Sequence, residues 1–241
     1  MKVVILAGGY GSRLSEYTDV IPKPMIKIGG EPIIKHIMNI YSQYGFKDFF
    51  IALGYKGEVI KNYFLNYKSI NSDFTVNLKD GNLKFHNNNQ DDWNVTLVDT
   101  GVDTQTGGRL LNISEYLDDS PFMMTYGDGL SNVNLYKLLE FHKKHGKLAT
   151  VTAVQAIPRF GLVELDDHKV KSFSEKPKAK DSWINGGFFV FEKEVIKYLK
   201  DKYTVLEKEP LENLAAQEEL CAYKHYGFWQ CMDTKRDRDR L

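Results

Sequence analysis

The stretch that decides the fold runs from Met1 to Met25 and reads MKVVILAGGYGSRLSEYTDVIPKPM. It opens with an unbroken apolar run, Val3 to Leu6, which favours a strand buried on both faces of a parallel sheet. The strand leads straight into a glycine-rich turn, Gly8 to Gly11. Because glycine has no Cβ, successive main-chain N–H groups in such a turn can surround an anion. The stretch therefore predicts a phosphate site at the end of the first strand.

Two cationic side chains follow this turn. Arg13 offers a forked, permanently charged partner for phosphate oxygens, and Lys23, between Pro22 and Pro24, offers a compact charge on a stiff segment. The turn lacks the Gly-Lys-Ser/Thr ending of a P-loop, and Leu14 stands where a dinucleotide fold has its third glycine. An NAD-dependent enzyme is therefore excluded. Taken alone, a turn of this kind is about as consistent with a plain connection as with a phosphate site.

Beyond the turn, strands and helices alternate. The expected strands of the sheet are 2–7, 49–53, 93–100, 122–126, 149–156, 188–191 and 222–228, and the expected helices are 31–44, 58–67, 107–117, 134–145, 194–200 and 209–220. This order predicts an α/β, Rossmann-like fold with a mostly parallel sheet flanked by helices. A turn at 79–82 and a strand pair, 159–165 with 170–173, predict small antiparallel insertions. We expect one domain over residues 1–241.

The composition argues against nucleic acid and membranes as partners. Lys plus Arg equals Asp plus Glu at 32 each, so no overall field attracts nucleic acid or an anionic membrane. No apolar run approaches the roughly 18 residues that cross a bilayer, and Met1 leads directly into a strand, so we expect a cytoplasmic protein. Cys221 and Cys231 are too few for a disulfide framework, and His142 and His145 fit a structural role at a helix end.

Three further features could carry chemistry, and two of them have a plain structural alternative. Asp128, between two glycines after a strand, lies where open α/β sheets hold ligands, but it could equally cap the next helix. Gly107 and Gly108 open a helix whose N–H groups could meet a ligand. Glu175 and Lys176 could bind a sugar phosphate, or they could form an exposed ion pair of little energetic value.

The run Leu6 to Leu14, LAGGYGSRL, followed by Pro22-Lys23-Pro24-Met25, resembles the signature of the sugar-1-phosphate nucleotidylyltransferases. The resemblance covers the whole chain and implies the nucleotide-diphospho-sugar transferase type of fold. Four stretches narrow it to the branch that transfers cytidylyl groups to glucose 1-phosphate: 93–101, 106–110, 126–129 and 184–190.

The resemblance implies in-line attack by α-D-glucose 1-phosphate on the α-phosphorus of CTP, giving CDP-glucose and pyrophosphate. It assigns Mg²⁺ to Asp128 and Asp233, and catalysis to Lys23 and Arg13. Cytosine would be selected by the loop Gly101 to Arg109, with Arg109 as a donor. The residues expected to contact substrates are Leu6, Ala7, Gly8, Gly9, Gly11, Ser12, Arg13, Lys23, Thr104, Thr106, Gly107, Gly108, Arg109, Tyr126, Gly127, Asp128, Glu175, Lys176, Asn185 and Gly186.

The resemblance also implies a homo-oligomer, such as a hexamer, and a place in O-antigen and lipopolysaccharide biosynthesis. The chain departs from the branch at Ser12, where threonine is usual, and at Ile21, where a lysine is common. The alternatives are transfer of a uridylyl or thymidylyl group, a different phosphorylated substrate, or a non-catalytic module that binds sugar nucleotides.

Overall fold

A computed structural model describes residues 1–86, 91–155, 162–174 and 182–241. Its centre is a sheet with the strand order β14-β10-β13-β8-β1-β4-β7. These strands are β1 (Lys2–Leu6), β4 (Asp48–Leu53), β7 (Asn94–Asp99), β8 (Phe122–Tyr126), β10 (Ala149–Gln155), β13 (Trp183–Phe191) and β14 (Leu220–His225). Only β13 runs antiparallel to its neighbours in this sheet, so the expected mostly parallel α/β fold is confirmed.

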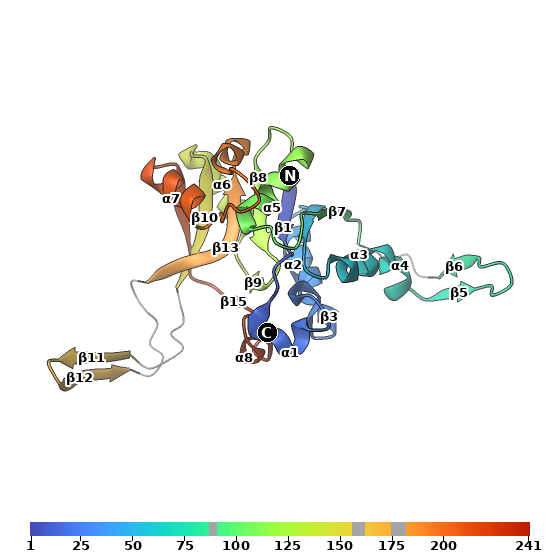
Figure 1. The fold of residues 1–241 in the computed structure, drawn as a ribbon, viewed down its shortest axis with the longest axis horizontal. Helices are drawn as coiled ribbons and strands as arrows, with labels where there is room; N and C mark the ends of the chain where they lie inside the picture. Colours follow the sequence, from blue (N-terminus) through green and yellow to red (C-terminus); the bar gives the residue numbers. More distant parts are fainter. Residues whose placement is uncertain (87–90, 156–161, 175–181) are drawn as a thin grey trace.

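Helices cover both faces of the sheet (Figure 1). They are α1 (Ser15–Thr18), α2 (Ile33–Ser42), α3 (Gly57–Leu65), α4 (Tyr67–Ile70), α5 (Thr106–Ile113), α6 (Leu135–His145), α7 (Glu209–Ala216) and α8 (Lys235–Arg238), with 3₁₀ turns η1 (Ser12–Leu14), η2 (Lys23–Met25), η3 (Ser114–Tyr116) and η4 (Lys193–Tyr198). Side chains of β1 alternate between two cores, since Val3 and Ile5 pack with α2 and α6, whereas Val4 and Leu6 pack with α5 and α7. This alternation explains the unbroken apolar run of the first strand.

The chain changes direction across the sheet beside β1. From β1 it continues to β4 and β7 on one side, and then returns to place β8 on the other side of β1. The loops that follow these four parallel strands therefore meet at one edge. In open α/β sheets the crevice at such a reversal is where ligands bind.

Four short antiparallel pairs complete the described fold. They join β2 (Lys27–Ile28) to β3 (Glu31–Pro32), β5 (Phe74–Val76) to β6 (Leu83–Phe85), β9 (Gly129–Ser131) to β15 (Trp229–Cys231), and β11 (Leu162–Asp166) to β12 (Lys169–Ser174). The β5–β6 and β11–β12 hairpins extend away from the sheet in Figure 1 and confirm the expected insertions. Part of one expected strand, 159–161, lies outside the described residues.

Several expected boundaries were wrong. The helix expected from Glu31 starts at Ile33, because Glu31 and Pro32 pair with β2. The helix expected to end at Leu220 stops at Ala216, because Glu218 has a left-handed φ of 58° and Leu220 begins the edge strand β14. Asn185 and Gly186 lie within β13 and not before it. Among the described residues, no helix is both long enough and apolar enough to span a membrane.

Candidate active site

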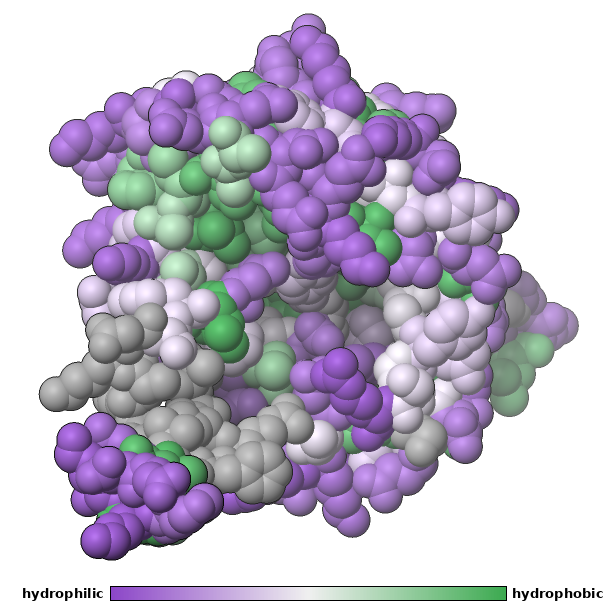
Figure 2. Space-filling model, turned by 60° about the vertical axis from the view of Figure 1, so that its left-hand side comes forward, coloured by the Kyte–Doolittle hydropathy of each residue, from purple (hydrophilic) through white to green (hydrophobic). Residues whose placement is uncertain are grey.

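A cavity of about 930 Å³ opens at the reversal between β1 and β8. Its walls come from the turn after β1, the end of β8, the loop between β7 and α5, the middle of β13 and the segment around β15. The face of the molecule in Figure 2 is hollowed near its centre, with hydrophilic residues around much of the hollow. The cavity is large enough for a nucleotide-sized ligand.

The glycine-rich turn after β1 lies open to this cavity. Gly8, Gly9 and Gly11 line it, and Gly9 is exposed with no atom within 4 Å of where a Cβ would stand. Within the described residues, none of the main-chain N–H groups from Gly8 to Gly11 donates to another main-chain group. These groups remain free to bind an anion, as the sequence predicts.

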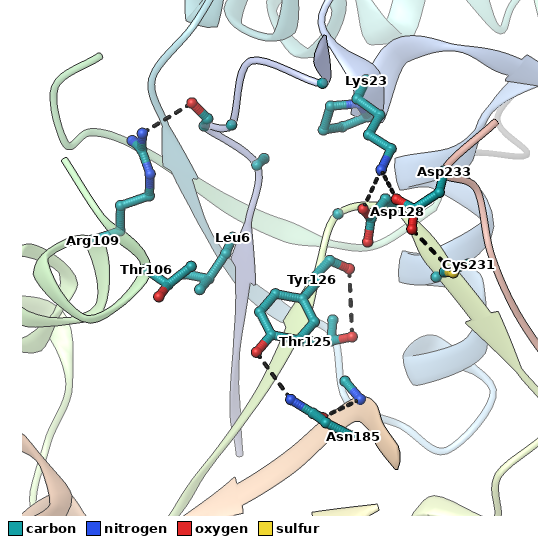
Figure 3. Close-up of a pocket in the computed structure, with 18 of the residues that line it drawn as sticks. Leu6, Lys23, Thr106, Arg109, Thr125, Tyr126, Asp128, Asn185, Cys231 and Asp233 are labelled. Carbon is teal, nitrogen blue, oxygen red and sulfur yellow. Dashed lines mark hydrogen bonds and ion pairs between the residues drawn. The ribbon is translucent and has the colours of Figure 1, made fainter. Parts of the chain in front are cut away.

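Lys23 joins two carboxylates that lie 105 residues apart in the sequence (Figure 3). Its Nζ is 2.6 Å from Asp128 Oδ2 and 2.9 Å from Asp233 Oδ1. Burial by itself would lower the pKa of Lys23, but the two carboxylates outweigh it and raise the pKa above its ordinary value. The ammonium is therefore charged at neutral pH, and the start of η2, the end of β8 and the segment after β15 meet at one point.

Arg13 reaches the same cluster from outside. Its side chain is 71% exposed, and one guanidinium nitrogen lies 2.8 Å from Asp233 Oδ2. Ser12 is also exposed, and neither residue lines the cavity, although both were expected to contact substrate. Arg13 therefore stands at the rim, on the far side of Asp233 from Lys23.

Arg109 was expected to donate a hydrogen bond to the cytosine base, but its guanidinium hydrogen-bonds the protein itself. It is buried, and its guanidinium donates to four main-chain carbonyls and to Thr100 Oγ1. The carbonyls belong to Gly8, Leu53, Gly101 and Val102, at 2.8 to 3.2 Å. Figure 3 shows the side chain turned toward the glycine-rich turn. Arg109 thus ties that turn to the loop after β7, and these donors are already used.

Gly107 and Gly108 were expected to offer their N–H groups to a ligand, but in the structure they pack closely against another segment of the chain. A Cβ on Gly108 would lie 2.5 Å from main-chain atoms of Lys202, and one on Gly107 would lie 2.8 Å from the carbonyl of Thr204. The N–H of Gly108 donates to that same carbonyl. Neither glycine lines the cavity. Both allow α5 to approach the segment 202–204, and they are not a second open anion site.

The opposite wall holds the residues expected near the sugar. These cavity-lining residues are Tyr126, Gly127, Asn185 and Gly186. The cavity is also lined, elsewhere on its surface, by Leu6, Ala7, Thr104 and Thr106. Asn185 Nδ2 donates to the Tyr126 hydroxyl at 3.3 Å, and the Trp229 indole donates to the Gly186 carbonyl at 2.7 Å. Glu175 and Lys176 lie outside the described residues.

Sequence reasoning missed two residues that line the cavity, Tyr10 and Trp229, and one that hydrogen-bonds lining residues, Glu207. Tyr10, in the glycine-rich turn, donates to Asp103 Oδ1 at 3.0 Å and so joins the two loops. Trp229 packs beside Gly186, and Glu207 holds Tyr126 and Thr106. Tyr10 could have been noticed as an aromatic inside a glycine turn. The other two give no local signal, because their partners lie at least 43 residues away.

The same cluster fits a divalent ion. Asp128 and Asp233 each place a carboxylate oxygen within 2.9 Å of the Lys23 Nζ, so two oxygen ligands of the kind that Mg²⁺ prefers lie close together. Among the described residues, no group of three or more His, Cys, Asp or Glu could hold a metal. Magnesium commonly takes one or two carboxylates and completes its shell with water and phosphate oxygens.

Comparisons with known proteins identify the family of this chain. The family model described as "Nucleotidyl transferase" matches residues 2–233. The glucose-1-phosphate cytidylyltransferases of Salmonella typhi and Salmonella typhimurium are each 52% identical over 239 residues, covering 99% of this chain and 93% of theirs. A UDP-glucose pyrophosphorylase solved with UDP-glucose has a TM-score of 0.70 at 18% identity, covering 99% of this chain and 96% of that one, and shows the same fold. The chain belongs to the nucleotidyl transferase family, in its glucose-1-phosphate cytidylyltransferase branch.

Proposed function

We propose that this enzyme makes CDP-glucose and pyrophosphate from CTP and α-D-glucose 1-phosphate. The observation that carries the proposal is the Lys23 ammonium between Asp128 and Asp233, next to a turn with free N–H groups at the sheet reversal. The identity to two named cytidylyltransferases supports the choice of substrates.

This arrangement suits a transfer between two phosphates. The sugar phosphate is itself an anionic nucleophile, so the protein has to bring two polyanions together and stabilise charge on the α-phosphate and the departing pyrophosphate. The free N–H groups from Gly8 to Gly11 would hold the triphosphate, while Lys23 would bind the phosphoryl group being transferred. Arg13, at the rim, would contact the leaving pyrophosphate.

A covalent enzyme intermediate is not required. Cys231 lines the cavity, but burial, followed by the charge of Asp233, raises its pKa to about 11. Its thiol is therefore protonated at neutral pH and is a poor nucleophile. Direct in-line attack by an oxygen of glucose 1-phosphate on the α-phosphorus fits the residues present.

We assign Mg²⁺ to Asp128 and Asp233. When bound, the ion would neutralise phosphate charge and align the triphosphate. The ion would bind the carboxylates that contact Lys23 in this structure. The Lys23 ammonium would then bind phosphate oxygens of the triphosphate instead.

Base and sugar would bind on opposite walls. Leu6, Ala7 and Thr104 line the wall beside the loop after β7, where main-chain groups can match the amino group and N3 of cytosine. Arg109 would act there indirectly, by fixing Gly8, Gly101 and Val102. Tyr126, Asn185 and Gly186 would face the glucose.

Several broader features rest on the family alone. We infer a single domain over residues 1–241, a homo-oligomer and a role in O-antigen supply. We also infer residence in the cytoplasm, where CTP is made. Sedimentation of the purified protein tests the assembly.

Product identification tests the proposal. The purified enzyme is given each of the four NTPs with a panel of sugar phosphates and Mg²⁺, and pyrophosphate and sugar nucleotide are measured. We expect CTP with glucose 1-phosphate to give the highest kcat/KM and to yield CDP-glucose. A higher value with UTP or dTTP would overturn the base assignment. Binding of CTP without turnover of any pair would favour a non-catalytic module.

A further inference from the structure

Glu207 lies between the two walls of the cavity, although no part of the proposed reaction needs it directly. Its carboxylate accepts hydrogen bonds from the Tyr126 hydroxyl through Oε1 and from Thr106 Oγ1, at 2.6 Å, through Oε2. Both Thr106 and Tyr126 line the cavity. In the proposed function, Thr106 lies on the wall that would bind the nucleotide, and Tyr126 on the wall that would bind the sugar. We propose that Glu207 is a positioning residue that couples the nucleotide subsite to the sugar-phosphate subsite. This inference rests on the proposed function.

The hydrogen bonds at Tyr126 are directional. A phenol has one hydrogen, and Tyr126 donates it to Glu207 while its oxygen accepts from Asn185 Nδ2 at 3.3 Å. The Asn185 side-chain oxygen in turn accepts from the N–H of Gly187 at 2.8 Å. Glu207 therefore fixes which way the Tyr126 hydroxyl points, and through it the amide of Asn185.

The hydrogen bonds at Thr106 are directional as well. Its hydroxyl donates to Glu207 and accepts from the N–H of Leu206 at 2.9 Å. The N–H of the preceding residue, Gln105, donates to the Lys202 carbonyl at 2.8 Å. The start of α5 is thus attached to the segment 202–207 at several points. A shift of that segment would move the loop that lines the nucleotide wall.

Only a carboxylate can complete this arrangement. Both partners donate to Glu207, and an ionised carboxylate accepts through both oxygens. A glutamine at this position could accept from Tyr126 or from Thr106 through its one amide oxygen, but its amide nitrogen could not accept the other hydrogen.

Steady-state kinetics with matched variants tests the coupling. Glu207→Ala should raise the KM of both substrates by about tenfold, with a smaller fall in kcat, because the loss is mainly one of shared binding geometry. Glu207→Gln should restore the KM of one substrate more than that of the other, because its single amide oxygen can accept from Tyr126 or from Thr106 but not from both. Glu209→Gln is the control, since that carboxylate is exposed and pairs with the exposed side chain of Lys200.

A double-mutant cycle separates coupling from a general loss of structure. In a Tyr126→Phe background, Glu207→Ala should no longer change the KM for glucose 1-phosphate but should still raise the KM for CTP. A lower melting temperature with both KM values unchanged would overturn the proposal, as would equal effects on kinetics from Glu209→Gln.

The two proposals can fail separately. If the wild-type enzyme turns over another pair of substrates, the same kinetics are measured with that pair. If it turns over none, the proposed function fails, and the coupling is judged by urea unfolding of Glu207→Ala, Tyr126→Phe and the double variant. Non-additive unfolding free energies would then support a link through Glu207, and additive values would refute it.

Discussion

Two glycine-rich segments of this chain look alike in the sequence and do different work in the fold. Gly8 to Gly11 follows β1, lines the cavity and leaves its N–H groups without main-chain acceptors, whereas Gly107 and Gly108 begin α5 and pack closely against the segment 202–204. A Cβ on Gly9 would meet open space, and a Cβ on Gly108 would meet main chain at 2.5 Å. Glycine therefore signals a ligand site only where its N–H groups stay unused after folding.

The cations near the two segments differ in the same way. The ammonium of Lys23, beside the first segment, bonds the side-chain carboxylates of Asp128 and Asp233, and a phosphate can replace these. Arg109, beside the second, bonds carbonyls of the fold itself. One cation is available for chemistry, and the other holds loops in place.

The largest expected effect is at Lys23. Lys23→Ala should lower the single-turnover rate of transfer by about 10³-fold, because it removes a charge placed against the transferring phosphoryl group. The Kd of CTP should rise far less. Rapid-quench measurements and calorimetry give the two numbers. Equal losses in rate and affinity would show that Lys23 only anchors the nucleotide.

The carboxylates should come next. Asp128→Asn should lower kcat by about 10²-fold and raise the Mg²⁺ concentration needed for half-maximal rate, because a neutral amide is a weaker ligand for a hard cation. Asp118→Asn is the control, since that carboxylate is exposed and pairs with Lys2 away from the cavity. An unchanged Mg²⁺ dependence in Asp128→Asn would contradict the metal assignment.

A pair of alanine substitutions tests the glycine comparison itself. Gly9→Ala should leave the melting temperature unchanged and raise the KM for CTP by about tenfold, because its methyl group would occupy the space of the triphosphate. Gly108→Ala should instead lower the free energy of unfolding by about 1 to 3 kcal/mol, because α5 would be pushed off the segment 202–204. Thermal unfolding and kinetics of both variants decide the matter. The reverse pattern would exchange the roles of the two segments.

The smallest effect is expected far from the cavity, where two histidines link α6 to β10. The N–H of Lys147 donates to His145 Nδ1 at 2.9 Å, so His145 carries its hydrogen on Nε2, which lies 2.7 Å from Thr150 Oγ1. His142 Nδ1 lies 2.8 Å from the same hydroxyl, and its Nε2 lies 3.2 Å from Glu192. Burial favours the neutral form of both rings, and it outweighs the Glu192 carboxylate, which favours the charged form of His142.

Burial lowers the pKa of His142, and burial followed by the charge of His142 lowers that of His145. The unfolded chain then binds more protons than the folded one below the ordinary histidine pKa of about 6.5, so stability should fall as the pH drops through that value. Urea unfolding between pH 8 and pH 5 measures this slope. His145→Gln should reduce it, and His168→Gln, at an exposed hairpin tip, should not. An unchanged slope in His145→Gln would contradict the neutral pair.

Much of the fold could be predicted because its signals are local. The apolar run of β1 is continuous because both of its faces are buried, and α6 is marked by the Asn134 cap and by Gly146 in a left-handed conformation. The end of α7 could not be predicted, because the strand that starts at Leu220 depends on pairing with β10, about 70 residues earlier. Helix propensity alone predicts that the helix continues to Leu220.

The site divides in the same manner. The position of Asp128 follows from the rule that ligands bind where parallel strands end, and the resemblance supplied Asp233, which the fold brings to the same ammonium. The commitment of Arg109 to carbonyls and the bridge through Glu207 could not be predicted. Both depend on partners from elements far apart in the sequence, which only the folded chain brings together.

A crystal structure with a non-hydrolysable CTP analogue and Mg²⁺ tests the central claim most directly. We predict the β- and γ-phosphates on the N–H groups of Gly8 to Gly11, with the ion on Asp128 and Asp233 and the Lys23 ammonium on a phosphate oxygen. A triphosphate bound at Gly107 and Gly108, or bound out of reach of Lys23, would contradict it.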